Sequence, residues 1–242
     1  MPPRRRLGLC AAVLAGWLWA AGAGAANLQI SPVVINFRAD QGAAGIHLHN
    51  LGEAPIYGQV RVFAWDQQGG AEVLTATREL LASPPIVQIA ANGRQTIRLV
   101  RGGEAAPAGE RTFRVLIDEL ARDDGPAGSG VDIRLRYSVP VFVAPPADAG
   151  KEALSWHFFK KDGDWMLRVR NSGTLHAQIG ALSVANRAGK DFPISEGLFG
   201  YVLAARMREW RLPVAGDADL SGPLTIRANI NAKALVASNA AE

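Results

Sequence analysis

The four histidines are the residues of this 242-residue sequence best suited to bind a metal ion. His47 and His49 are two positions apart, so both side chains would lie on the same face of a β-strand. A zinc site needs at least three protein ligands, and no third ligand stands at a suitable spacing from this pair. We therefore expect surface or turn positions for the histidines, His157 included, with His176 fixing a turn. No metal ion or other cofactor is predicted.

Residue patterns of common enzymes are also missing from the sequence. It contains no nucleophile elbow. It also contains no glycine-rich loop that could bind phosphate, since Gly102-Gly103 is an isolated pair. Asp118 and Glu119 are adjacent, so on a strand they would point to opposite faces and could not act as an acid and base pair. We expect no enzymatic activity.

The tryptophans beyond the first 26 residues could form a platform that binds carbohydrate. They are spread over four separate segments, at Trp65, Trp156, Trp165 and Trp210. Such spacing is more typical of core and interface residues than of one exposed surface.

The first 26 residues have the pattern of a secretion signal. Arg4, Arg5 and Arg6 precede an apolar stretch from Leu7 to Ala21, and small residues follow up to Ala26. The alternative is a membrane anchor, but the stretch is short and no basic flank follows it. We expect residues 1–26 to be cleaved from an exported protein.

Removal of this segment changes the charge and the cysteine content. The segment holds three of the 26 basic residues and none of the 22 acidic ones, which leaves 23 against 22, or a net charge of +1. Such a balance gives no support to nucleic-acid binding. Cys10, the only cysteine, is also lost, so the mature chain would have neither disulfide nor thiol chemistry.

Short apolar or alternating segments, separated by Gly, Pro, Asn and Asp, predict an all-β protein. No stretch keeps a helical period for more than about three turns. The first half contains seven expected strands, the number typical of an immunoglobulin-like sandwich. They are Leu28 to Phe37, Gly45 to His49, Tyr57 to Trp65, Ile86 to Ala90, Gln95 to Val100, Thr112 to Leu120 and Val131 to Val143.

The two prolines Pro145 and Pro146, with the small residues that follow up to Gly150, predict a linker. We therefore expect one domain over residues 27–144 and a smaller one over 145–242. Ala71 to Leu81 is expected to form a short helix or a loop, and Lys233 to Glu242 a weakly ordered tail. Strands of the second domain are expected at Ser155 to Phe159, Trp165 to Arg170, Ala177 to Val184, Met207 to Leu212 and Leu224 to Ile230.

The last expected strand of the first domain alternates with a period of two. One face carries Val131, Ile133, Leu135 and Tyr137, and charged residues occupy the other. An ordinary half-buried strand would show the same pattern. The preceding glycine-rich segment, residues 123–130, favours an accessible sheet edge instead.

Several separated motifs together resemble a known family. They are Ser83-Pro84-Pro85, Gln95-x-x-Arg98-Leu99-x-Arg101, Glu110-Arg111-x-Phe113-Arg114-Val115, Arg136-Tyr137-Ser138-Val139-Pro140-Val141-Phe142-Val143 and Asn171-x-Gly173-x-x-His176-Ala177. In this order they resemble the periplasmic chaperones of chaperone-usher pilus assembly. Within that family the sequence is most similar to the archaic branch, which handles spore-coat-U-like pilins.

The resemblance implies a fold and a function. It implies two immunoglobulin-like β-sandwich domains in a boomerang arrangement, located in the periplasm. The strand with Val131, Ile133, Leu135 and Tyr137 would be donated to a pilin that lacks its final strand. The implied partners are pilin subunits and an outer-membrane usher, without nucleic acid or a small-molecule substrate.

One pair of positions departs from the family pattern. Better-studied relatives bind the pilin's terminal carboxylate with an arginine and a lysine, whereas Val34 and Pro140 stand at those positions here. A buried carboxylate needs a paired cation or several donors. Arg114 is therefore the first candidate anchor, followed by Arg98 and Arg101. The alternative is an internal role for these arginines, such as an ion pair between Arg98 and Glu110.

A binding module of another class is the alternative function. A secreted β-sandwich adhesin or carbohydrate-binding module would use exposed aromatic residues in place of a donated strand. A hydrolase with an unrecognised site is a further alternative.

Overall fold

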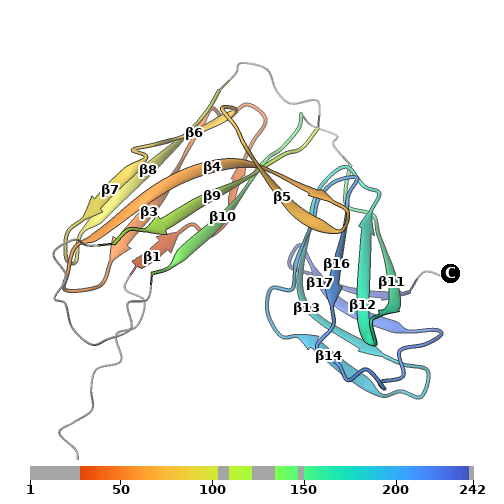
Figure 1. Cartoon of the computed structure of the whole chain (residues 1–242). Helices are drawn as coiled ribbons and strands as arrows, with labels where there is room; N and C mark the ends of the chain where they lie inside the picture. Colours follow the sequence, from red (N-terminus) through yellow and green to blue (C-terminus); the bar gives the residue numbers. More distant parts are fainter. Residues whose placement is uncertain (1–27, 103–108, 122–133, 147–149, 240–242) are drawn as a thin grey trace, which may run out of the picture.

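The computed structural model describes residues 28–102, 109–121, 134–146 and 150–239, and every regular element in them is a β-strand. Residues 1–26, Val131 and Ile133 lie outside the described residues. The strands form two β-sandwiches that meet at an angle, as in a boomerang (Figure 1). The described ranges contain no helix able to cross a membrane. The all-β fold class expected from the sequence is confirmed.

The first sandwich packs a four-stranded sheet against a six-stranded sheet. The four-stranded sheet has the order β1 (Leu28–Ser31), β3 (Ala43–Asn50), β8 (Arg94–Arg101), β6 (Leu80–Ser83). The six-stranded sheet has the order β2 (Ile35–Phe37), β10 (Arg136–Val143), β9 (Arg111–Glu119), β4 (Ile56–Gln68), β5 (Ala71–Ala76), with β7 (Ile86–Ile89) also on β4.

Alternating side chains explain why these strands pair as a sandwich. In β8, Ile97 and Leu99 are fully buried while Arg98 between them is exposed. β9 likewise buries Val115 and Ile117 in the same core. Because each inner face is continuously apolar, only the face-to-face arrangement removes both faces from water.

The second sandwich has sheets of three and five strands. The smaller sheet has the order β11 (Leu154–Lys161), β12 (Asp164–Asn171), β16 (Met207–Arg211). The larger has the order β14 (Asp191–Ser195), β13 (Ala177–Ala185), β17 (Thr225–Ile230), β18 (Lys233–Ser238), with β15 (Gly200–Val202) also on β13. Its core is separate from that of the first sandwich and contains Trp156, Leu167 and Ile179.

Three local expectations from the sequence are wrong. Ala71 to Leu81 contains β5 and the start of β6 in place of a helix or loop, and the tail forms β18 up to Ser238. β5 is mostly exposed, so it lacks the alternation of a half-buried strand, and β18 packs only Leu235 and Ala237 against the core. Leu28 to Phe37 is two strands, β1 and β2, which belong to opposite sheets.

Candidate functional site

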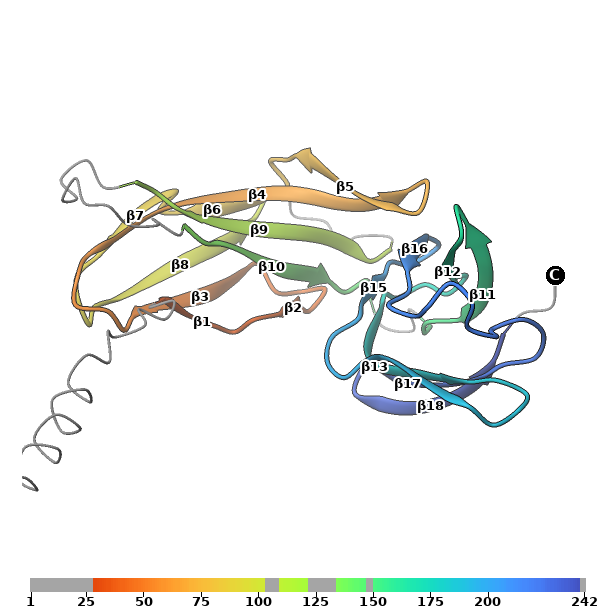
Figure 2. The same cartoon turned by 60° about the horizontal axis from the view of Figure 1, so that its bottom comes forward.

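Strand β10 has neighbours on both sides along only part of its length. β9 pairs with all of it, from Arg136 to Val143, but β2 pairs only with Val141 to Val143 (Figure 2). No described residue pairs with Arg136 to Pro140 on the side away from β9. We call these five residues the open edge. It offers unpaired backbone groups to another strand.

The direction of the backbone groups along the open edge follows from one hydrogen bond. The Glu119 N–H donates to the Leu135 carbonyl at 3.0 Å. Antiparallel pairs alternate between bonded and non-bonded, so Tyr137 and Val139 also face β9, whereas Arg136 and Ser138 direct their backbone groups outward. Pro140, which has no N–H, shares their outward register.

The apolar face of β10 runs from the core of the first domain toward the start of the strand. Val139 is buried in that core, Tyr137 packs against it half-buried, and Leu135 is only partly buried. The Tyr137 hydroxyl donates to Glu119 Oε1 at 3.2 Å. Burial and the nearby Glu119 carboxylate together raise the pKa of Tyr137 to about 12. Val131 and Ile133, the other two expected donor residues, are outside the described ranges.

Arg114 lies across from Pro140, where the open edge ends. Its side chain is 11% exposed and stacks over the ring of Trp65 at 3.7 Å, with Glu72 at 3.4 Å. Burial lowers the pKa of Arg114, although Glu72 opposes the shift. Its Nε has no hydrogen-bond partner, so this cation retains a donor in a largely water-free place.

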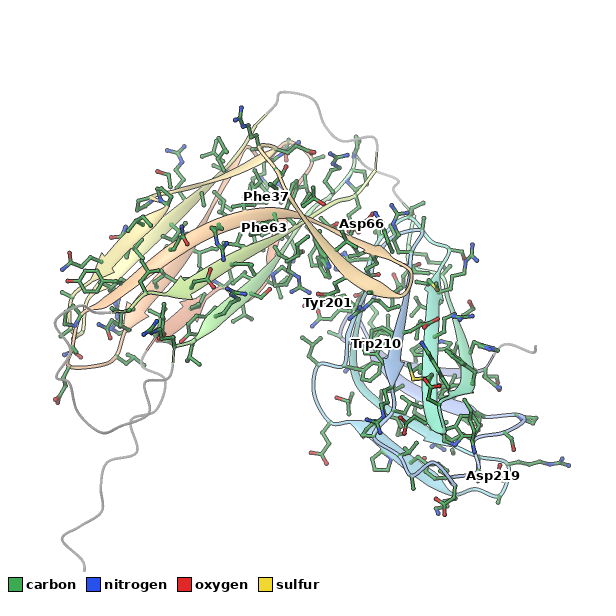
Figure 3. All side chains as sticks on the ribbon, viewed as in Figure 1. Phe37, Phe63, Asp66, Tyr201, Trp210 and Asp219 are labelled. Carbon is green, nitrogen blue, oxygen red and sulfur yellow. The ribbon has the colours of Figure 1, made fainter. Side chains whose placement is uncertain are left out.

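The surroundings of Arg114 join the two domains. Trp65 and Phe142 of the first sandwich pack against Tyr201 and Leu203 of the second, with Val34 at their side. Figure 3 shows Tyr201 where the domains meet, on the side of the labelled first-domain residues. A cluster of this kind needs residues far apart in the chain, so each looks like an ordinary core residue in the sequence.

Comparison with known protein families shows to which family the chain belongs. Residues 27–148 match the pili and flagellar-assembly chaperones through the PapD N-terminal domain, a segment covering half of the 242 residues. The chain belongs to this family. No curated protein matches the chaperone.

The fold of the chaperone is similar to that of solved pilus chaperones. In the CsuC–CsuE chaperone–tip adhesion subunit pre-assembly complex from archaic chaperone-usher Csu pili of Acinetobacter baumannii, a chain matches at 23% identity and a TM-score of 0.69, covering 88% of this chain and 98% of that one. The Salmonella enterica SafA pilin–SafB chaperone complex matches at 18% identity and 0.58, covering 88% and 94%. The Pseudomonas aeruginosa CupB2 chaperone matches at 15% and 0.58, covering 88% and 100%.

The other two candidate anchors lie on the opposite sheet from Arg114. Arg98 and Arg101 belong to β8, whereas Arg114 belongs to β9. Arg98 is exposed on the outer face, and Arg101 Nη1 donates to the carbonyls of Ala39 and Gln41 at 2.8 and 3.1 Å. The chaperone therefore does not bring the three arginines together.

His176 has a different role from the one expected. Its backbone N–H donates to Glu110 Oε2 and its Nδ1 lies 2.7 Å from Glu110 Oε1, so it joins the second domain to the start of β9. Asn171 fixes the turn instead, because its side chain bonds the Gly173 N–H and the Leu175 carbonyl. The alternative pairing of Arg98 with Glu110 is also wrong.

Three residues at the domain junction were not predicted from the sequence. Glu72 lies between Arg114 and Arg208, and the Nη2 atom of Arg208 is 3.9 Å from Glu72 Oε1. Gln67 Nε2 donates to the Tyr201 carbonyl at 2.8 Å. All three depend on the β4–β5 hairpin reaching the second domain, which no local pattern signals. At its tip Gly70 accepts from the Glu209 N–H, and an added Cβ would meet the Glu209 side chain at 2.9 Å.

The histidines and tryptophans form neither of the sites weighed from the sequence. In the described ranges no three His, Cys, Asp or Glu side chains gather as metal ligands. Trp65, Trp156 and Trp165 are buried, and Trp210 packs against Phe199. These four tryptophans occupy core and interface positions, so they do not form an exposed platform for carbohydrate.

Proposed function

We propose that this protein is a periplasmic chaperone that binds pilin subunits by donor-strand complementation and delivers them to an outer-membrane usher. The observation that carries the proposal is the open edge of β10, with which no described residue pairs on the side away from β9 and whose apolar face continues into the core. Two of the similar structures hold a chaperone with a tip adhesion subunit or a pilin. The greater likeness to the archaic Csu complex supports assignment to the archaic branch.

The physical reason for such a role is the exposed surface of an incomplete pilin. A sandwich that lacks a strand exposes apolar side chains and unpaired backbone groups, both of which drive aggregation. Pairing with the open edge satisfies the backbone groups, and burying four apolar side chains would contribute roughly 6 to 12 kcal/mol before ordering costs. Val131, Ile133, Leu135 and Tyr137 are the proposed set. Binding alone accounts for the role, so the proposal includes no enzymatic step.

Domain boundaries form part of the proposal. A cleaved signal over residues 1–26 would place the protein in the periplasm, with the chaperone domain over 27–144 and the second sandwich over 145–242. Both cores agree with this division, since one draws on residues 28–143 and the other on 154–237.

We further propose Arg114 as the anchor of the pilin's terminal carboxylate. It lies beside Pro140 at the end of the open edge, and Val34 and Pro140 provide no charge there. Arg208 adds a second cation from the other domain, so the pair exceeds the single carboxylate of Glu72 by one charge. Anchoring at this point would set the register of the inserted strand, and a slip of one residue would reverse every side chain.

A proline on the open edge tests the function directly. Ser138 is exposed and directs its N–H outward, so Ser138→Pro removes a donor from the open edge without breaking a bond to β9. Ser138→Ala is the matched control. We expect wild type and Ser138→Ala to form a stable heterodimer in gel filtration when co-expressed with a pilin encoded beside this chain, and Ser138→Pro to lose most of it. Equal capture by all three proteins would contradict the proposal, and glycan retention would support an adhesin.

A further inference from the structure

Two arginines share the single carboxylate of Asp118 at the start of the open edge. Arg61 Nη2, from β4, donates to Asp118 Oδ2 at 2.7 Å, and Arg136 Nε, from β10, donates to Oδ1. Asp118 stands between them on β9, directly opposite Arg136. The carboxylate side chain is 15% exposed, whereas that of Arg136 is 63% exposed. The buried partner is therefore the anion, and the cation faces water.

The charges of this group do not cancel. Asp118 carries one negative charge and binds two arginines, so it neutralises only one of them. Among the described residues that line this surface, the other carboxylate is Glu119, which accepts from the Leu135 N–H at 3.4 Å and from the Tyr137 hydroxyl. Asp118 is therefore shared by two guanidinium groups, which exceed its single negative charge by one, while Glu119 is directed to Leu135 and Tyr137 instead.

The surplus charge lies in a hollow of the surface. A depression of about 430 Å³ is lined by the two arginines and Asp118, together with Gln59, Glu119, Arg134 and Leu135. Arg136 bonds the described residues only through Nε, so its two Nη groups keep their donors. Arg61 Nε also has no partner. An acceptor with negative charge is the ligand that these donors fit.

We propose that Arg136, held in place by Asp118 and Arg61, binds the carboxylate of an Asp or Glu on the pilin strand that pairs with the open edge. This inference rests on the proposed function, because it requires that strand. Neighbouring strands lie about 4.8 Å apart, and side chains directly opposite each other are close enough to interact. A guanidinium also matches a carboxylate with two parallel hydrogen bonds.

Arg61 and Asp118 act as positioning residues in this arrangement. Asp118 fixes the Nε side of Arg136 and so directs the Nη groups away from β9. Arg61 compensates the Asp118 charge, because without it Arg136 and Asp118 would form a neutral pair with little attraction for a further carboxylate. The depression would thereby select pilins with an acidic residue in one register, since a shift by one residue moves that side chain to the other face.

Charge reversal with a matched control tests the proposal. Arg136→Glu is compared with Arg227→Glu, whose arginine forms an exposed ion pair with Asp191 in the second domain. The probe is purified pilin encoded beside this chain, captured at low and high salt, with thermal unfolding in parallel. We expect Arg136→Glu to slow capture at low salt by about tenfold or more, the difference to shrink at high salt, and Arg227→Glu to match wild type.

A charge swap on the pilin separates recognition from general electrostatics. Asp and Glu residues of the pilin strand are changed singly to Lys, and one such variant should restore capture by Arg136→Glu while weakening capture by wild type. Unchanged capture by Arg136→Glu, or a loss that no pilin variant restores, would overturn this inference but leave the proposed function standing. If wild type captures no pilin at all, both fall.

Discussion

The imidazole of His176 stacks on the phenyl ring of Phe142, with ring centres 3.5 Å apart and planes 3° from parallel. Phe142 belongs to the last strand of the first domain and His176 to the turn before β13, so the stack bridges the domains. The Glu110 side chain, which is 4% exposed, bonds the backbone N–H and the ring Nδ1 of His176. The strand that provides the open edge therefore also helps to hold the second domain.

Replacing His176 should weaken the domain junction. His176→Ala removes the stack and leaves the buried Glu110 without its ring donor, a loss of about 1 to 3 kcal/mol in the free energy of unfolding. His176→Phe keeps a stacking partner and should cost less. His47→Ala, at an exposed position on β3, is the control and should change stability by under about 0.5 kcal/mol. Urea unfolding measures all three, and a stable His176→Ala protein would show that the junction does not depend on this pair.

Gln67 is a second link between the domains. Its side chain donates to the Tyr201 carbonyl at 2.8 Å and accepts from the Leu203 N–H at 3.0 Å, and the residue is 2% exposed. Gln67→Ala leaves two buried backbone groups unpaired, each costing about 1 to 3 kcal/mol. The neighbouring Gln68→Ala removes only an exposed hydrogen bond to Asp66 and should change stability far less. Small-angle scattering should show a wider range of domain angles only for Gln67→Ala, and identical profiles would refute the role.

The two links show what could and could not be predicted from the sequence. Half-buried strands such as β8 were predicted because alternation reports burial on one face. Gln67 was missed because its partners are in the other domain, more than 130 residues away in the case of Tyr201. Glu72 was missed because it bridges Arg114 of its own domain and Arg208 of the other, and both are far from it in the sequence. His176 was assigned to a turn for the same reason. The candidate site could be predicted as a strand, but its open edge depends on where β2 begins, since its first residue, Ile35, pairs with Val141.

Acid should weaken the junction through Asp66. Burial raises the pKa of this carboxyl, but hydrogen bonds from Arg206, the Gln67 N–H and Gln68 outweigh it, so the net pKa is lowered. Because the pKa of Asp66 is lower in the folded protein than in the unfolded protein, ionised Asp66 stabilises the fold at pH values above the unfolded pKa of about 3.9. This stabilisation is lost as the pH falls through the folded pKa. Figure 3 shows Asp66 at the junction.

Asp66→Asn tests this acid dependence. The variant should be less stable than wild type at neutral pH by under about 1 kcal/mol, because the ion pair with Arg206 is partly exposed. The difference should shrink as the pH falls below about 3.9 and disappear once the pH is below the folded pKa. Urea midpoints between pH 7 and 2.5 measure it, with Asp40→Asn, at an exposed ion pair, as control. A constant difference at every pH would show that Asp66 acts by shape alone.

A leucine and a valine on the apolar face of the donor strand should respond differently to substitution by aspartate. Leu135 is partly exposed before β10 begins, so Leu135→Asp should fold normally and fail to bind pilin, because an aspartate cannot enter an apolar groove. Val139 is 4% exposed in the core, and Val139→Asp should unfold the protein. Circular dichroism and pilin capture separate the two effects. If Leu135→Asp also unfolds, that position belongs to the core of the chaperone.

Arg114 should contribute more to pilin capture than an exposed arginine does. Its side chain lies at the end of the open edge and is 11% exposed, so an ion pair formed with a terminal carboxylate would be largely shielded from water. Arg114→Ala should weaken capture by about 2 to 5 kcal/mol, the range for truncating one partner of a buried charge pair. Arg98→Ala, exposed on the opposite sheet, should cost under about 1 kcal/mol.

Because Arg114 also stacks on Trp65, thermal unfolding is measured in parallel, and a pilin extended by one residue at its C-terminus provides a second readout. Wild type should lose affinity for the extended pilin, whereas Arg114→Ala should bind both pilins alike. A similar loss for both chaperones would assign Arg114 to the domain junction and place the anchor elsewhere.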